Sequence, residues 1–244
     1  MPRATRASPA QDTARKPRPS TSLEQKKNLK LAAIREAARI TFTEKGFDAA
    51  TMQEIAWRAR VAIGTLFLYA DNKRDIAFLA SMEDFDRARA AGAAFPTTPP
   101  LAEQFTAIFA AYYRLHHASP AMARVILSEF LFFNVGKHAR EHAEGVRLIK
   151  AELARRAGLA SARGELRATA VPADVAELAY IVFQGAVRAW VRAGADDLPA
   201  GLAACHRMLC LALEGVTAPA EAAVPVRRHR SAGIKPSAGA ASTP

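Results

Sequence analysis

Apolar residues recur at a helical spacing through the centre of the chain, and no segment alternates apolar and polar residues with a period of two. Residues 27–45 place Leu31, Ile34, Ala38 and Phe42 on one stripe, and Gly46 follows where a helix is expected to end. The pattern predicts further helices at residues 51–59, 63–69, 72–92, 101–118, 120–133, 137–157, 173–194 and 198–215. It therefore predicts an all-α protein of about nine helices.

Two of these helices are short and are joined by a tight turn. Thr51 is a suitable N-cap for the first, and Glu54 at the third helical position is expected to complete a capping box. Asp71 or Asn72 can cap the helix that follows the second. Two short helices behind a longer one have the geometry of a helix-turn-helix unit, although helical hairpins also serve as purely structural parts of bundles.

Composition and charge narrow the classes of partner and the cellular location that we expect for the protein. The net charge of +11 favours a polyanionic partner, with nucleic acid ahead of a membrane surface. Residues 1–22 and 219–244 are basic, rich in proline or small residues and without apolar periodicity, so both are predicted to be disordered arms. The apolar runs are too short for a membrane span and the N-terminus has no secretory signal, so we expect a cytoplasmic protein without a membrane partner.

The residues around the turn carry a more specific signal. Their pattern is Ala37-Ala38-x3-Phe42-x3-Gly46-Phe47-x3-Thr51-Met52-x2-Ile55-Ala56-x2-Ala59-x-Val61-x2-Gly64-Thr65-Leu66-Phe67-x-Tyr69-x3-Lys73. This run resembles the DNA-binding signature of the TetR family of bacterial transcriptional regulators, tightly over about residues 30–78. The resemblance implies a three-helix helix-turn-helix DNA-binding domain at residues 23–78, followed by a helical effector-binding and dimerisation domain at residues 79–218.

The resemblance also implies which residues contact DNA. Gly64 lets the backbone approach the DNA closely, Thr51 contacts a phosphate while it caps its helix, and Tyr69 and Lys73 lie where the family places phosphate contacts. Thr65, with Ile63 and Leu68 near it, is expected to face base edges, including thymine methyl groups. The predicted DNA-binding residues are Thr51, Arg60, Ile63, Gly64, Thr65, Leu68, Tyr69 and Lys73.

Four residues depart from the family pattern. Arg60 stands where the family usually has Gly, and Ala62 where Ser is common, so a helix cap and a phosphate-contacting hydroxyl are expected to be lost. Phe67 replaces a frequent Tyr, and Ala70 replaces a nearly standard Phe. Arg60 can compensate as an extra phosphate contact, and the basic arm before residue 23 can reach a neighbouring minor groove or be merely solvated.

Aromatic residues gather in the second half of the chain. Such rings usually form a core, but the resemblance makes an apolar effector cavity among these helices plausible, with a few polar contacts. The candidate effector-binding residues are Phe109, Tyr112, Tyr113, His116, Phe130, Phe133, Phe183 and Trp190.

The helix at 173–194 is apolar on two sides, which one bundle cannot bury. Together with the last helix it fits a two-fold homodimer whose interface has four helices, as in the family. The predicted interface residues are Leu178, Val182, Gly185, Ala186, Ala189, Leu202, Leu209 and Leu213.

Motifs for other functions are weak. His138 and His142 have a spacing that can hold a metal, but no third ligand is placed by the sequence, and neither a metal site nor a cofactor is expected. The sequence has no nucleophile elbow and no phosphate loop, so an enzyme is not expected. The sequence predicts a transcriptional regulator, and a repressor rather than an activator, that leaves its operator when a small apolar or aromatic effector binds. The alternative is a helical ligand- or partner-binding protein whose DNA-binding domain has degenerated.

Overall fold

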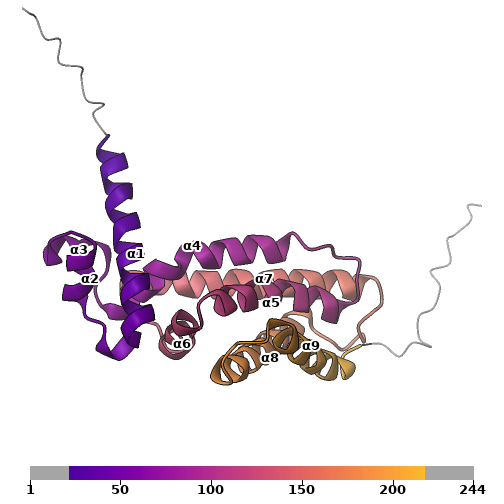
Figure 1. Ribbon diagram of the computed structural model, residues 1–244. Coiled ribbons are helices and arrows are strands. Elements are labelled where there is room, and N and C mark those ends of the chain that lie inside the picture. Colours follow the sequence, from indigo (N-terminus) through magenta and orange to yellow (C-terminus); the bar gives the residue numbers. More distant parts are fainter. Residues whose placement is uncertain (1–21, 218–244) are drawn as a thin grey trace, which may run out of the picture. The chain divides into compact units, whose positions relative to one another are not determined.

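The structure is a computed structural model that describes residues 22–217 (Figure 1). Within that range it has nine helices and no strand, apart from an isolated antiparallel bridge between Leu166 and Thr217. The helices are α1 (Leu23–Ala49), α2 (Met52–Arg58), α3 (Ile63–Tyr69), α4 (Lys73–Ala93), α5 (Leu101–Ala118), α6 (Pro120–Glu129), α7 (Ala139–Ala162), α8 (Pro172–Arg192) and α9 (Leu198–Glu214). The all-α prediction is confirmed, and the two predicted arms, except Ser22, lie outside the described residues.

Side-chain caps fix where several helices begin. Ser22 starts α1 with a complete capping box, because its hydroxyl accepts from the Gln25 amide and the Gln25 side chain accepts from the Ser22 amide. Thr51 caps α2 and Asn72 caps α4, as predicted. The capping box predicted for α2 is only half formed: the Glu54 carboxylate binds Lys45 and Arg58 instead of the Thr51 amide.

Gly46 breaks the first helix. Its φ of +75° is in the left-handed region that favours glycine, so the regular part of α1 ends there and a short helical turn completes the element. The break brings the ring of Phe47 into a stack on Phe42, with ring centroids 5.8 Å apart. The predicted end of the first regular helix at this glycine is confirmed.

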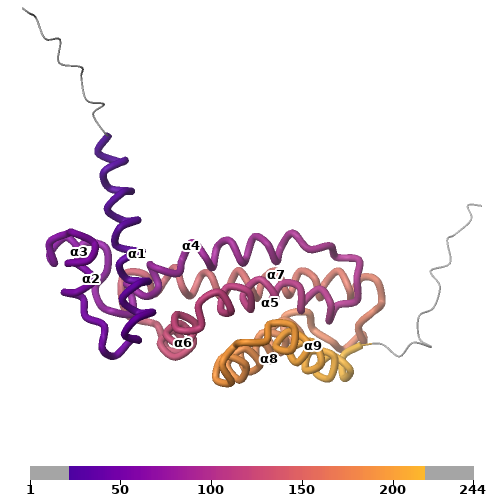
Figure 2. The backbone as a smooth tube through the Cα atoms, in the orientation of Figure 1, coloured from indigo at the N-terminus to yellow at the C-terminus, as the bar shows by residue number. Residues whose placement is uncertain are grey.

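The chain forms two compact units, each with its own core. Among the described residues, the first unit contains residues 22–84 and Ser119–Ala143, so α1, α2, α3, the beginning of α4 and α6 belong to it. α2 and α6 both pack on α1, and α3 packs on α2 (Figure 2). Fully or nearly fully buried side chains at Ile34, Phe42, Ile55, Leu66 and Phe78 form the core of this unit.

Among the described residues, the second unit contains Phe85–Ala118 and residues 144–217. Here α8 and α9 pack against each other and both pack on α5. Gly201 allows a close approach at the start of α9, because a Cβ atom there would lie 2.6 Å from the indole nitrogen of Trp190. The core of this unit includes Phe105, Phe109, Tyr113 and Leu209.

The guanidinium of Arg156 lies wholly inside the second unit. It donates to the carbonyl groups of Ala93, Phe95 and Pro96, to the Gln104 side chain and to Glu152. One buried side chain therefore holds the connection between α4 and α5.

Within residues 22–217, no helix is both long enough and apolar enough to cross a bilayer.

Candidate nucleic-acid interface

A tight turn sets the geometry of α2 and α3. The Val61 amide donates to the Ala56 carbonyl and the Arg60 amide donates to the Trp57 carbonyl, which together make a Schellman motif. Arg60 occupies the left-handed position of this motif, with a φ of +55°. The loss of the α2 cap expected from the missing glycine is therefore wrong, because the backbone bonds form with Arg60 in a less favourable conformation.

The second short helix begins without a side-chain cap. Ala62 is the N-cap of α3 and makes no side-chain hydrogen bond, as its replacement of a common Ser predicted. Gly64 lies in the first turn, where a Cβ atom would meet no heavy atom within 4 Å. The N-terminal turn of α3 thus presents bare backbone to the surroundings.

The predicted DNA-binding residues lie at the start of α2, in the turn, along α3 and at the start of α4. Arg60 is exposed, and its side chain makes no hydrogen bond or ion pair within the described part of the chain, so its guanidinium is available. Ile63 and Leu68 are 39% and 76% exposed, and Thr65 and Tyr69 are half-buried. Leu66 is fully buried and packs α3 on the rest of the unit.

Lys73 has a structural role that the sequence did not reveal. Its ammonium group donates to the carbonyl groups of Asp48 and Ala50, at 3.0 and 3.1 Å, and lies 4.5 Å from the centre of the Phe47 ring. These contacts join the start of α4 to the end of α1. An ammonium group has three donors, so one remains for another acceptor.

The connection between α6 and α7 holds the C-terminal end of α3. Lys137 donates through its ammonium group to the Phe67 carbonyl, at 2.5 Å, and forms an ion pair with Asp71. The Nε2 atom of His138 lies 2.9 Å from the Tyr69 carbonyl, which can only accept, so this nitrogen carries the hydrogen. Both contacts reach carbonyl groups in the last turn of α3, and such carbonyl groups have no hydrogen-bonding partner within the helix.

A buried carboxylate fixes this connection in place. Asp75, in the first turn of α4, accepts from the backbone amides of Asp71, Lys137 and His138, at 2.8 to 3.1 Å. Gly136 has a φ of +130°, and a Cβ atom there would lie 2.3 Å from the Asp75 carboxylate. Only glycine fits at this position.

Ion pairs surround the outer side of α2. Hydrogen bonding to Lys45 lowers the pKa of Glu54, and hydrogen bonding to Glu44 raises the pKa of Arg58. All four groups keep contact with solvent, so these pairs contribute little to stability and mainly fix the side-chain positions.

Several residues of this region were missed by sequence reasoning. Trp57 is 76% exposed on α2, and Phe67 is 45% exposed on α3. The spacing of Trp57 opposite the buried Ile55 and Ala56 could have revealed its exposure. Lys137 and His138 could not have been found, because some seventy residues separate them from α3.

The candidate effector residues fall into two groups in different units. In the second unit the Phe109 and Phe183 rings stack with centroids 4.3 Å apart, Tyr112 also contacts Phe183, and Tyr113 lies against Trp190. In the first unit Phe130 and Phe133 pack on Phe78 and His142. The prediction that these residues line one effector cavity is therefore wrong for Phe130 and Phe133. These two residues contribute to the core of the first unit, beside the start of α4.

Two buried polar atoms in the second unit lack partners within the described residues. They are the Tyr113 hydroxyl and the Nδ1 atom of His116, in side chains that are 0% and 3% exposed. Burial, together with the nearby Arg188, lowers the pKa of His116 to about 4, so the ring is neutral near pH 7. Burial raises the pKa of Tyr113, which keeps its proton. An uncharged donor and acceptor pair is thus available among aromatic rings.

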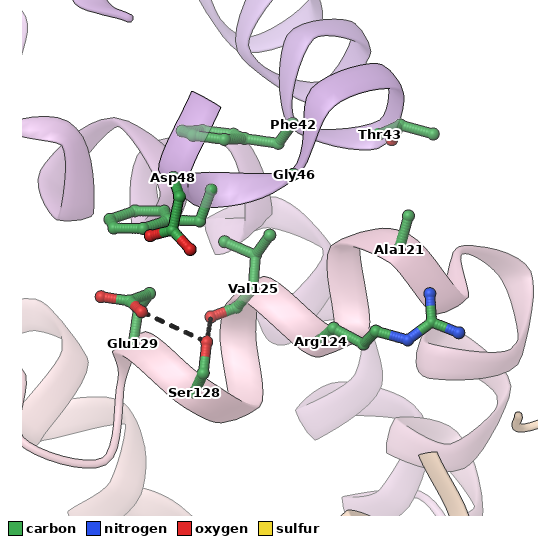
Figure 3. Close-up of a pocket in the computed structure, with 10 residues that line it drawn as sticks. Phe42, Thr43, Gly46, Asp48, Ala121, Arg124, Val125, Ser128 and Glu129 are labelled. Carbon is green, nitrogen blue, oxygen red and sulfur yellow. Dashed lines mark hydrogen bonds between the residues drawn. The ribbon is translucent and has the colours of Figure 1, made fainter. Parts of the chain in front are cut away.

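A separate hollow lies in the first unit, between the end of α1 and α6 (Figure 3). It has a volume of about 450 Å³ and includes none of the candidate effector residues. The Ser128 hydroxyl on its wall donates to the Val125 carbonyl and to Glu129, and Glu129 also binds Arg74. Its residues are Phe42, Thr43, Gly46, Phe47, Asp48, Ala121, Arg124, Val125, Ser128 and Glu129.

The predicted interface residues are only partly at the surface. Gly185 and Ala189 are exposed on α8, and Leu178, Val182, Ala186 and Leu202 are half-buried. Leu209 and Leu213 are 0% and 3% exposed within their own chain, so their assignment to a dimer interface is wrong. The helical phase of α9 turns them inward and places Met208 and Leu211 outward, at 52% and 60% exposed.

His138 and His142 are both held by other contacts. His138 bonds Glu141 and the Tyr69 carbonyl, and His142 packs on aromatic rings, where burial lowers its pKa. Within the described residues, no group of three or more candidate ligands that could hold a metal ion is present.

Comparisons with known proteins agree with the geometry of the turn and its two short helices. Residues 34–79 match the family model described as bacterial regulatory proteins, tetR family. This range contains the end of α1, the whole of α2 and α3, and the start of α4. The sequence matches no curated protein.

Solved structures of bacterial regulators are similar in fold to about three quarters of this chain. The fatty acid degradation regulator FadR from Bacillus halodurans is 21% identical, with a TM-score of 0.57 over 73% of this chain and 96% of that one. FadR from Bacillus subtilis in complex with stearoyl-CoA is 20% identical, with a TM-score of 0.59 over 75% and 98%. SmeT, the repressor of the Stenotrophomonas maltophilia multidrug efflux pump SmeDEF, is 15% identical, with a TM-score of 0.55 over 78% and 91%. The similarity to the tetR family of bacterial regulatory proteins thus covers residues 34–79.

Proposed function

We propose that the protein is a transcriptional regulator that binds operator DNA through α2, its turn and α3, and releases the DNA when a small molecule binds the second unit. The observation that carries this proposal is the Schellman turn, which presents α3 with an exposed outer side and with both of its ends fixed. We propose repression and not activation, because a protein that occupies an operator obstructs transcription.

The DNA contacts follow from exposure and charge. Arg60 and the remaining donor of Lys73 are proposed to bind phosphates, together with the Tyr69 hydroxyl and the Thr51 residue at the start of α2. The exposed first turn of α3, at Gly64, is proposed to lie closest to the DNA, with Thr65 at a base edge.

The test is a salt titration on a DNA site selected with the full chain from random duplexes. Specific binding should exceed binding to random DNA, and the logarithm of the association constant should fall linearly with the logarithm of salt concentration. Tyr69→Phe should weaken binding to both kinds of DNA. Thr65→Ala should instead change base preference at one position, by about 1–3 kcal/mol, with little effect on random DNA.

The alternative is a ligand- or partner-binding protein with a degenerate DNA-binding domain. The uncapped Ala62 at the start of α3 favours it, because a phosphate-binding hydroxyl is absent there. Equal and weak binding to all duplexes, with a folded protein, would support this alternative and reject the regulator.

We infer an uncharged recognition site for the effector in the second unit. The stacked rings of Phe109 and Phe183 offer apolar surface, and neutral His116 offers an Nδ1 atom without a partner, while the Tyr113 hydroxyl lies beside the Cys205 thiol. The structures of FadR with stearoyl-CoA and of SmeT with triclosan, which are similar in fold, support a ligand with a large apolar part.

The effector proposal is tested with those two compounds as probes. Either stearoyl-CoA or triclosan is titrated into the complex of protein and selected DNA, and release is measured by fluorescence anisotropy. Ala111→Trp, which enlarges a buried residue of α5, should mimic or block release without a change on the DNA-binding surface. Unchanged operator affinity and unchanged ligand response in this variant and in His116→Leu would remove this site from the proposal.

We also propose a two-fold homodimer through α8 and α9. Ile181, Gly185 and Ala189 of α8 and Met208 and Leu211 of α9 are exposed, and small residues would let partner helices approach closely. Ile181→Glu should convert the dimer to a monomer in sedimentation at micromolar concentration. Leu131→Glu, at a similarly exposed leucine of the first unit, should leave the dimer intact.

The division of labour along the chain is part of the same proposal. Residues 23–78 would read DNA and residues 79–218 would bind effector and partner, in the cytoplasm, where the bacterial chromosome lies. No catalytic residue, metal or cofactor is needed for this function.

A further inference from the structure

The outer side of α3 has an unusual chemistry for a helix that reads DNA. Among the seven residues Ile63–Tyr69 there is no charged side chain and no amide side chain. Thr65 and Tyr69 are the hydrogen-bonding residues of the helix, and both are half-buried. The exposed side chains are apolar: Ile63 at 39%, Phe67 at 45% and Leu68 at 76%.

This composition limits how bases can be read. Guanine is usually recognised by Arg or Lys, and adenine by Asn or Gln, through paired hydrogen bonds in the major groove. None of these residue types occurs within α3. The apolar group that the major groove offers to an apolar side chain is the 5-methyl group of thymine.

We propose that α3 selects its operator mainly through thymine methyl groups, with Leu68 as the principal specificity-determining residue and Ile63 as the second. This inference rests on the proposed function. The bare first turn at Gly64 allows the close approach that van der Waals contact with a methyl group requires.

Charge around the apolar side chains favours DNA as the occupant over a protein surface. The unpartnered Arg60 precedes α3, and Lys73 follows it with one donor unused. Residues 23–80 contain ten basic and seven acidic residues, so the segment that carries α3 is positive. Apolar side chains between the unpartnered guanidinium of Arg60 and the remaining donor of Lys73 match the methyl groups and phosphates of a major groove.

The experiment replaces thymine by deoxyuridine, which keeps the base pair and removes the methyl group. The site is first selected with the full chain from random duplexes, and each thymine is then replaced in turn. One lost methyl contact should weaken binding about three- to fourfold, the equivalent of burying one methylene group. Replacement at the two symmetric positions of a dimeric site should weaken it roughly tenfold.

Two variants locate the contact on α3. In Leu68→Ala the difference between thymine and deoxyuridine should disappear at one position of the site. Leu29→Ala is the matched control, because Leu29 is also an exposed leucine, at 65%, but lies on α1. It should keep the full difference. Both side chains are exposed, so both variants should fold, which thermal unfolding verifies.

The outcomes separate this inference from the proposed function. If no duplex is bound selectively, the proposed function fails. If a site is selected but its deoxyuridine versions bind equally well, the regulator stands and the methyl readout is wrong. A thymine preference that persists in both Leu68→Ala and Ile63→Ala would also overturn the inference, because DNA shape and not α3 would then sense the methyl group. Loss of self-association in Leu68→Ala, with the thymine preference unchanged, would make the patch a protein contact instead.

Discussion

Arg60 combines an unfavourable backbone angle with a free charge. A left-handed conformation costs a non-glycine residue about 1 kcal/mol or more, and Arg60 has a φ of +55°. We therefore expect Arg60→Gly to raise the free energy of unfolding by about 0.5–1 kcal/mol and the Tm by a few degrees. The same variant should lower the slope of the salt titration by about one unit, because a phosphate contact is lost.

Arg60→Ala separates the two effects. Alanine keeps the strained angle and removes the charge, so the salt slope should fall as in Arg60→Gly while the Tm stays near that of the wild type. A glycine variant no more stable than the alanine variant would show that the turn is unstrained.

Arg156 is the largest fully buried side chain of the described chain, and its contacts predict a large effect of its loss. Arg156→Leu would leave the carbonyl groups of Ala93, Phe95 and Pro96 and the side chains of Gln104 and Glu152 without this donor. We expect a loss of about 3–5 kcal/mol in the free energy of unfolding, measured by urea titration. Arg155→Leu makes the same change of charge at the exposed neighbour, which also binds Glu152, and should cost less than about 1 kcal/mol.

At the scale of elements, the connection between α6 and α7 is expected to control the position of α3. Gly136→Ala would place a methyl group against the Asp75 carboxylate and would strain a φ of +130°. The connection should then move, and Lys137 and His138 would lose their contacts with α3. We expect operator affinity to fall at least tenfold and the protein to lose about 2 kcal/mol of stability.

The control for this element is a glycine with free space. Gly145 lies within α7 in helical conformation, and a Cβ atom there meets nothing within 4 Å. Gly145→Ala should stabilise the helix by about 0.5–1 kcal/mol and should not affect DNA binding. If Gly136→Ala binds the operator as tightly as Gly145→Ala, the connection does not position α3.

Local signals explain why the helices were predictable. Glycine and cap residues act on the backbone next to them, so Gly46 and Asn72 marked helix ends that the structure confirms. The match of residues 34–79 to the tetR family model agrees with the predicted resemblance, because the signature of the family consists of fixed short spacings. The end of α6 was predicted four residues too late, since the apolar residues after Glu129 continue the pattern as core of a non-helical connection.

Long-range packing was not predictable. Periodicity shows that Leu209 and Leu213 share a side of α9, but it cannot say whether that side faces the same chain or a partner. Likewise Phe130 and Phe133 are close in sequence to the other candidate effector residues, yet they pack in the other unit. Which aromatic residues meet depends on how distant helices fold back, and no local pattern contains that information.

At the scale of the whole molecule, the buried His116 makes stability depend on pH. Its pKa is lowered to about 4, while a histidine in the unfolded chain has a pKa near 6.5. Between these values the unfolded chain binds more protons, so stability falls as the pH is lowered through this window. The expected contribution is roughly 3 kcal/mol between pH 6.5 and pH 4, and burial of His142 acts in the same direction.

Urea titrations at several pH values measure this dependence. In His116→Gln the slope of stability against pH should be shallower between pH 6.5 and pH 4, whatever the absolute stability of the variant. In His117→Gln, at the exposed neighbour, the slope should match that of the wild type. Equal slopes in the two variants would mean that His116 is protonated in the folded protein.

The first compact unit is assembled from two separate stretches of the chain, and this restricts how the gene can change. A single crossover after residue 84 would transfer α1, α2 and α3 without α6, which packs on α1, and without the rings of Phe130 and Phe133, which cover Phe78. The transferred DNA-binding unit would lose part of its core. Exchange of this unit between relatives therefore requires that both of its chain segments come from the same parent. New operator preferences are therefore reached more easily by point substitutions on the outer side of α3 than by shuffling of modules.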